Sequence, residues 1–82
     1  MIMQIEVQLS GFLQRVGLPS GFLGGTLDLP DGAIVMDALR LVGVDARSPW
    51  LITHNRALAQ YGTQLQDHDI LNIVPLISGG ML

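Results

Sequence analysis

The chain has 82 residues, of which 49% are apolar and only 13% are charged, and its formal net charge is −3. This length suits one domain with a small hydrophobic core, so we expect residues 1–82 to form a single domain. Four arginines, no lysine and no basic run argue against a nucleic-acid partner, and the absence of cysteine excludes disulfides and thiol nucleophiles within this chain.

Membrane insertion and secretion are not indicated either. The longest apolar stretches are interrupted by Asp37, Arg40 or Pro75 and fall short of the roughly 20 residues that cross a bilayer. The opening Met1–Gln4 lacks the basic and apolar regions of a signal peptide. We therefore expect a cytoplasmic protein with no membrane partner. Its many apolar side chains predict an exposed apolar patch that contacts a partner protein.

The first third of the chain predicts two strands joined by a loop. Apolar and polar residues alternate over Met3–Leu9, which is typical of a strand with one buried face. The glycine-rich segment 10–25 predicts an apolar loop with room for one helical turn over 12–16. Thr26–Leu29 alternates again and is followed by Pro30, which predicts a second, short strand.

One amphipathic helix of about three turns is predicted next. Asp31 is the expected N-cap, because its carboxylate can accept hydrogen bonds from the first backbone amides of the helix. Gly43 is the expected left-handed stop, and Asp37 and Arg40 would face away from the core. The apolar residues at helical spacing are Ile34, Val35, Ala38, Leu39 and Val42.

The second half of the chain reads as strands and turns. Trp50–His54 is rich in strand formers, and Asn55–Arg56 predicts a turn into the short apolar segment 57–59. A polar stretch follows, in which Asp67–Asp69 predicts a turn. Ile70–Val74 is a nearly continuous apolar run, which predicts a central strand covered on both faces.

This order of elements predicts an α+β fold, in which one main helix packs on one face of a mixed sheet. We expect the first and last strands to lie side by side in the middle of the sheet, as in the β-grasp fold of ubiquitin. That pairing is an expectation from the strand patterns and the analogy.

The most informative sequence follows the last strand. Pro75-Leu76-Ile77-Ser78-Gly79-Gly80 is uncharged, ends in two glycines and is followed by Met81 and Leu82. Glycine has no Cβ, so a diglycine can enter a narrow channel and leaves the carboxylate of Gly80 unhindered. We expect residues 76–82 to form a flexible tail that enters the active site of another protein. The alternative is a frayed terminus without function.

The chain resembles the ubiquitin-like sulfur carriers, the family of the small subunit of molybdopterin synthase and of the thiamine-biosynthesis sulfur carrier, over nearly its whole length and most specifically in its final third. The resemblance lies in Leu65, the turn at 67–69, the apolar strand, Pro75 and the diglycine, and Asn55 matches an Asn-Gly turn of the family. Two departures are His68 and Arg56, which stand where the family has glycine. Histidine tolerates positive φ better than most residues, so neither departure forbids the fold.

The resemblance implies a carrier that is not itself an enzyme and binds no cofactor or metal. An adenylyltransferase of the ubiquitin-activating type would adenylate the Gly80 carboxylate with ATP and magnesium. A persulfide donor would then convert the adenylate into a thiocarboxylate, and a biosynthetic enzyme would accept the sulfur. Gly79 would let the activating enzyme approach the Gly80 carboxylate. The residues that would guide the tail into the partner's active site are Pro75, Leu76, Ile77 and Ser78.

The third departure is that Met81 follows Gly80, so the Gly80 carboxylate is held in a peptide bond. We expect a peptidase to remove Met81-Leu82, and by family analogy a zinc metallopeptidase of the deubiquitinase type is the natural candidate. Two alternatives remain open. The chain could be a ubiquitin-like modifier that forms isopeptide bonds with lysines of other proteins, or an unprocessed β-grasp interaction module.

Other candidate sites are weaker. Asp67–Asp69 with His54 could suggest a metal or acid–base cluster, but adjacent turn residues diverge, so we expect a solvated turn and a half-buried surface histidine. Residues 21–25 resemble a phosphate loop but lack its lysine and its context, and a loop connection is favoured. Trp50 is expected to pack at the edge of the core.

The loop aromatics are ambiguous. For Phe12, Phe22 and Leu23, packing beneath the sheet and contact with a partner are equally compatible with the sequence.

Overall fold

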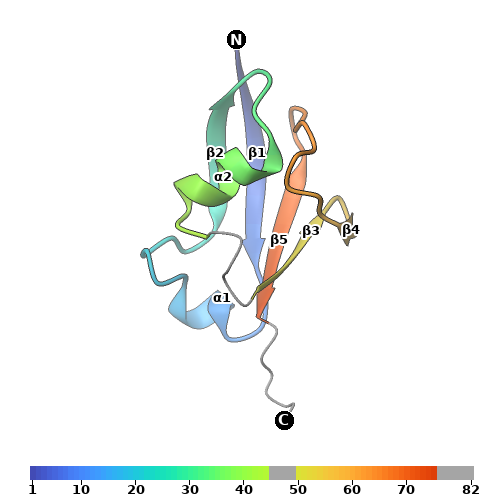
Figure 1. Ribbon diagram of the computed structural model, residues 1–82. Helices are drawn as coiled ribbons and strands as arrows, with labels where there is room; N and C mark the ends of the chain where they lie inside the picture. Colours follow the sequence, from blue (N-terminus) through green and yellow to red (C-terminus); the bar gives the residue numbers. More distant parts are fainter. Residues whose placement is uncertain (45–49, 76–82) are drawn as a thin grey trace.

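The computed structural model describes residues 1–44 and 50–75, and it contains one five-stranded sheet with a helix across one face (Figure 1). The strand order is β2-β1-β5-β3-β4, with β1 and β5 parallel and the other neighbours antiparallel. This is the predicted α+β arrangement. In chain order the elements are β1 (Ile2–Leu9), α1 (Leu13–Val16), β2 (Gly25–Pro30), α2 (Val35–Leu41), β3 (Trp50–His54), β4 (Ala57–Leu58) and β5 (Ile70–Pro75).

The first and last strands form the centre of the sheet, as the sequence predicted. In the parallel pair, Glu6 lies beside Ile70 and Leu9 beside Ile73. On its other side β5 runs antiparallel to β3, so that Pro75 lies opposite Trp50. The last strand is therefore held by hydrogen-bonded neighbours along both edges.

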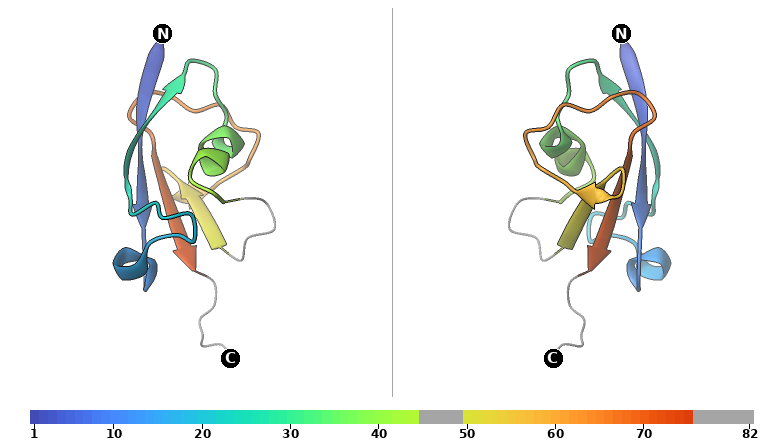
Figure 2. Two further views of the ribbon diagram at one scale, coloured as in Figure 1. Left: turned by 90° about the vertical axis from the view of Figure 1, so that its left-hand side faces the viewer. Right: turned by 90° about the vertical axis from the view of Figure 1, so that its right-hand side faces the viewer.

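The prediction that both faces of β5 are covered is wrong. Burial alternates along the strand: Leu71 and Ile73 are fully buried, whereas Ile70 is 39% exposed. Figure 2 shows the reason, because α2 lies on one side of the sheet only. We call the side away from α2 the open face. The apolar run arises because Ile70 and Val74 stand on that open face.

The core lies between α2 and the facing side chains of the sheet. From the helix, Val35, Ala38 and Leu39 are completely buried, and Val42 follows them inward. Each fully buried aliphatic side chain contributes roughly 1.5–3 kcal/mol through the hydrophobic effect. The strands contribute Met3, Ile5, Val7, Leu9, Leu29, Ile52, Leu71 and Ile73 to the same cluster.

The start of α2 differs from the prediction. The N-cap is Ile34, whose N–H donates to the Asp37 carboxylate at 2.9 Å, so Asp31 is not the cap. The next amides, of Val35 and Met36, donate to the carbonyls of Thr63 and Tyr61 at 2.9 and 3.0 Å. A loop far along the chain thus satisfies the first amides of the helix, which no local pattern could reveal. The helix has 7 residues, about two turns rather than three.

The end of α2 follows the prediction. Gly43 has φ of 86°, its N–H donates to the carbonyl of Arg40, and the N–H of Val44 donates to the carbonyl of Leu39 at 2.8 Å. These two bonds form a Schellman motif, in which a glycine after the helix takes the left-handed conformation. The Ser20 hydroxyl adds a hydrogen bond to the Val42 carbonyl at 2.6 Å.

No helix among residues 1–44 and 50–75 has the length and apolar character needed to cross a membrane.

Gly43→Ala should lower the free energy of unfolding by more than about 1 kcal/mol, because alanine is strained at positive φ. A Cβ at this position would also lie 2.6 Å from Ser20 Cβ. Gly21 has φ of 97° but open space around it, so Gly21→Ala should show the strain without the clash. Gly62→Ala introduces neither backbone strain nor a clash, so it should leave the free energy of unfolding nearly unchanged. Urea unfolding of the three variants checks this order, and an unaffected Gly43→Ala protein would contradict it.

Candidate functional site

Most of the predicted site lies outside the described residues. Pro75, the last residue of β5, is the only predicted tail-recognition residue that the structure describes. The roles proposed for the tail therefore stay predictions. The tail residues outside the described part are Leu76, Ile77, Ser78, Gly79, Gly80, Met81 and Leu82.

The base of the tail is firmly held. Pro75 is half-buried, and its ring packs so close to Gly11 that a Cβ there would lie 3.1 Å from Pro75 Cγ. The N–H of Ser10 donates to the carbonyl of Ile73 at 3.0 Å, which ties the end of β5 to the end of β1. Figure 1 shows this end of the sheet beside α1 and opposite the N-terminus. The sequence after Pro75 thus begins from a fixed point.

The loop aromatics divide between core and surface. Trp50 and Phe22 are partly buried and pack against the core, so the predicted packing of Trp50 at the core edge is confirmed. Phe12 is 44% exposed and Leu23 is 72% exposed. Of the three residues left open by the sequence, Phe22 is thus a packing residue, while Phe12 and Leu23 present apolar surface to solvent.

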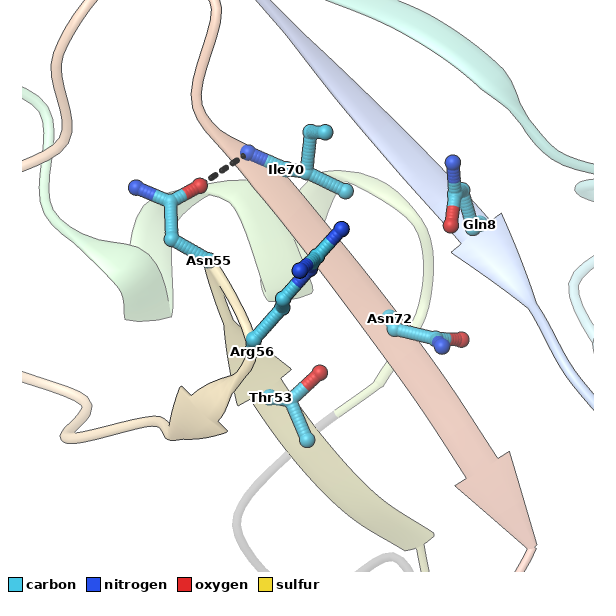
Figure 3. A pocket seen from close by; sticks show the side chains of 6 residues that line it. All are labelled: Gln8, Thr53, Asn55, Arg56, Ile70 and Asn72. Carbon is cyan, nitrogen blue, oxygen red and sulfur yellow. Dashed lines mark hydrogen bonds between the residues drawn. The ribbon is translucent and has the colours of Figure 1, made fainter.

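A hydrogen-bonded cluster around Asp69 joins β5 to the β3–β4 turn. The Asp69 carboxylate accepts hydrogen bonds from His54 Nε2 at 2.7 Å, Asn55 Nδ2 at 3.0 Å and the Gln66 N–H at 2.9 Å. In return, Asn55 Oδ1 accepts from the N–H of Ile70 at 2.8 Å (Figure 3). The cluster fixes where β5 begins relative to β3.

The predicted solvated turn is therefore only partly correct. The side chains of Asp67 and His68 are 56% and 82% exposed, but those of Asp69 and His54 are only 12% and 17% exposed. Asp69 is instead a structural anchor. Among the described residues, no group of three or more His, Cys, Asp or Glu side chains is arranged to hold a metal ion.

Burial of Asp69 opposes its ionisation, but the hydrogen bonds from Asn55, His54 and Gln66, together with the charge of His54, outweigh burial and lower its pKa below 3.8. A carboxylate whose folded pKa is lowered adds stability above its unfolded pKa, and that stability is lost as the pH falls through the folded value.

Asp69→Asn should therefore flatten the loss of stability in acid, while costing stability at neutral pH. The wild-type urea midpoint should fall as the pH drops below about 4, the ordinary pKa of aspartate, and the variant's midpoint should fall less. Asp31→Asn, at a 64% exposed side chain, serves as the control. Parallel pH profiles for wild type and Asp69→Asn would contradict this assignment.

Both turn departures noted in the sequence adopt positive φ. Asn55 has φ of 51°, Arg56 has φ of 76° and His68 has φ of 71°. Two successive positive values at 55–56 match the type I′ turns that join short hairpins, where the second position favours glycine. The chain thus keeps the expected turn geometry, and Arg56 and His68 bear its conformational cost.

Arg56→Gly should raise the free energy of unfolding by about 1 kcal/mol, because glycine adopts the left-handed conformation without steric cost. Arg56→Ala is the matched control, since it removes the same charged side chain but keeps the strain. Thermal unfolding should rank the glycine variant above both wild type and the alanine variant. Equal stability of the glycine and alanine variants would show that strain is not what limits the turn.

The open face carries a hollow of about 430 Å³ next to this turn (Figure 3). Sequence reasoning missed it, because its residues come from three strands and a turn and meet only through the sheet register. The pairing of Thr53 with Asn72, and of Asn72 with Gln8, brings them into one row. The residues that define this open-face hollow are Gln8, Thr53, Asn55, Arg56, Ile70 and Asn72.

Comparison with protein-family models and with curated proteins finds no match. Solved structures do match. SAMP1 from Haloferax volcanii is 26% identical, with 94% of this chain and 99% of that chain covered and a TM-score of 0.73. Another structure, of small archaeal modifier protein 1 from H. volcanii, is 24% identical, with 92% and 99% covered and a TM-score of 0.70.

A third similar structure is described as subunit 1 of a molybdopterin converting factor, from Pyrococcus furiosus. It is 18% identical, with 92% of this chain and 99% of that chain covered and a TM-score of 0.71. The likenesses below 25% identity carry the fold alone. These neighbours are small modifier proteins and a converting-factor subunit. The chain thus has the β-grasp fold of ubiquitin-like proteins, and its structural neighbours confirm the predicted resemblance to the sulfur-carrier family.

Proposed function

We propose that the chain is a sulfur-carrier protein that acts through the carboxylate of Gly80. The observation that carries the proposal is the position of the motif: Ser78-Gly79-Gly80 follows β5, whose end at Pro75 is packed against Gly11 and paired with Trp50. A rigid domain followed by an uncharged diglycine segment suits delivery of a terminal acyl group to another protein's active site. The similarity to small archaeal modifier proteins and to a molybdopterin converting-factor subunit supports this general kind of protein.

The proposed chemistry has four steps. A peptidase first hydrolyses the Gly80–Met81 bond and frees the carboxylate. An activating enzyme with ATP and magnesium then joins this carboxylate to AMP, and pyrophosphate leaves. The terminal sulfur of a persulfide then attacks the adenylate and displaces AMP, and a second thiol of the partner system cleaves the resulting acyl disulfide, which releases the thiocarboxylate and leaves a disulfide on the partner. Last, the thiocarboxylate passes its sulfur to a biosynthetic enzyme. The chain supplies the acyl group, while the partner enzymes supply the catalytic residues, the nucleotide and the metal.

Residues before the diglycine would guide the tail. Pro75 sets the direction in which the chain leaves β5, and Leu76, Ile77 and Ser78 are uncharged, as a narrow apolar channel requires. Gly79 and Gly80 offer no side chain to obstruct the adenylate. A zinc metallopeptidase remains the proposed processing partner, and the cytoplasm remains the proposed location.

A second candidate is a protein modifier, favoured by the 26% identity with SAMP1 over nearly the whole chain. Modifier and carrier share cleavage and adenylation and differ in the group that attacks the adenylate, which is a lysine amine for the modifier. This chain has no lysine, so a modifier of this sequence could not be extended into chains through its own side-chain amines. Adducts of high molecular weight would identify the modifier, whereas a thiocarboxylate would identify the carrier.

Intact-protein mass spectrometry of chain purified from its native host, without a C-terminal tag, should reveal a species that ends at Gly80. Part of this species should carry sulfur in place of one carboxyl oxygen. Gly80→Ala should sharply reduce the sulfur-bearing species, because a methyl group obstructs activation at the adenylated residue. Its thermal unfolding, measured alongside, controls for the fold. A chain that always retains Met81 while the pathway is active would instead favour the unprocessed interaction module.

A further inference from the structure

Arg56 places a positive charge in the open-face hollow, and the nearest acidic side chain on this face, Glu6, lies at the border of the hollow, where it accepts a hydrogen bond from Gln8 Nε2 at 3.1 Å. None of the ion pairs among the described residues includes Arg56, and none of the six residues that line the hollow is acidic. Figure 3 shows the guanidinium lying over β5, between Ile70 and Asn72. An arginine offers five N–H donors in a planar fork whose geometry matches a carboxylate. The hollow therefore has a donor group ready for an anion.

Two neighbouring side chains add donors to the same hollow. Asn72 Oδ1 accepts a hydrogen bond from the Ser10 hydroxyl at 2.8 Å, which orients the amide. Asn72 Nδ2 then has no acceptor among the described residues. The Thr53 hydroxyl faces the same space (Figure 3). Asn55, by contrast, already donates to Asp69 and accepts from Ile70, so its amide is held in place and forms a fixed wall.

The backbone at Arg56 indicates that its side chain has a use. Its φ of 76° costs free energy for any residue except glycine, and the type I′ turn favours glycine at this position. Strained residues that persist cluster at binding and catalytic sites, where the side chain compensates for the strain through function. Here the strained residue is also the one that supplies the charge of the hollow.

Exposed apolar side chains beside the hollow favour a protein ligand over a free anion. Ile70 is 39% exposed, and Leu58, paired with Thr53 across β3 and β4, is 70% exposed on the same face. A charged arginine bordered by exposed aliphatic side chains has the composition of a protein interface, where arginine is a frequent hot spot. A small anion would contact neither aliphatic side chain.

We propose that the open-face hollow binds the carboxylate of an aspartate or glutamate from a partner protein. Arg56 anchors the carboxylate, Asn72 and Thr53 complete its hydrogen bonds, and Ile70 and Leu58 pack against the apolar residues that flank the acidic one. This site is independent of cleavage and chemistry at Gly80. It would operate equally in a carrier, a modifier or an unprocessed module.

The test is an NMR titration of the full chain with two peptides, acetyl-Leu-Glu-Leu-amide and its uncharged counterpart acetyl-Leu-Gln-Leu-amide. The glutamate peptide should shift the Asn72 side-chain amide and the Arg56 Nε–H, and the glutamine peptide should bind about tenfold more weakly, because it loses the charge-assisted hydrogen bonds. Equal binding of both peptides would overturn the proposal. Sodium acetate and inorganic phosphate are titrated in parallel, and binding as tight as that of the glutamate peptide would identify a free-anion site instead.

Variants distinguish a specific contact of Arg56 from non-specific attraction by any arginine on the surface. Arg56→Gln should weaken the glutamate peptide about tenfold, whereas Arg40→Gln, at an exposed arginine of α2, should leave binding unchanged. Equal loss in both variants would reveal non-specific attraction and overturn the site. Arg56→Gly is the most decisive variant, since it should be more stable than wild type and still lose binding. Retained binding in that stabilised variant would also refute the role of Arg56.

Discussion

The parallel pairing of β1 with β5 is the contact on which the rest of the structure depends. It joins the first and last elements of the chain, with Glu6 beside Ile70 and Leu9 beside Ile73. Such a pairing closes a long loop, and the burial of apolar side chains must offset the chain entropy that is lost on closure. Leu71 and Ile73 of β5, together with Ile5 and Val7 of β1, provide this burial against α2. The same pairing makes β5 a rigid base for the sequence that follows Pro75.

The fold could be predicted largely because its signals are local. Alternation over β1, strand formers in β3 and the glycine after α2 each specify an element within a few neighbouring residues. The predictions were wrong where a segment distant in the sequence determines the local structure. The amides at the start of α2 are satisfied by carbonyls of Tyr61 and Thr63, so the cap at Asp31 was wrong. Likewise, Asn72 is the one polar residue within the apolar run of β5 and stands on the open face, but Ile70 and Val74 on the same face hide the alternation.

The candidate site divides in the same way. The diglycine and the turn departures at Arg56 and His68 were visible in the sequence, since unusual residues at glycine positions stand out. The partners of Asp69 were not, because His54 and Asn55 meet it only when β3 lies beside β5. The open-face hollow depends on the register of three strands, which fixes which polar residues share a row. The hydrophobic pattern of a strand specifies which of its faces is buried, but one strand read alone does not say which residues of its neighbours lie opposite.

One strand connects the two surfaces to which we assign roles. Ile70 and Asn72 of β5 line the open-face hollow, and the strand ends at Pro75. At about 3.3 Å per residue, Asn72 and Pro75 lie roughly 10 Å apart along a strand held on both edges. A partner whose carboxylate is bound in the open-face hollow would therefore have the start of the tail at a fixed distance from that contact. Rigid spacing of this kind lowers the entropy lost when the tail enters an active site, because one end is already positioned. The strained arginine in the turn would then contribute to tail delivery without touching the tail.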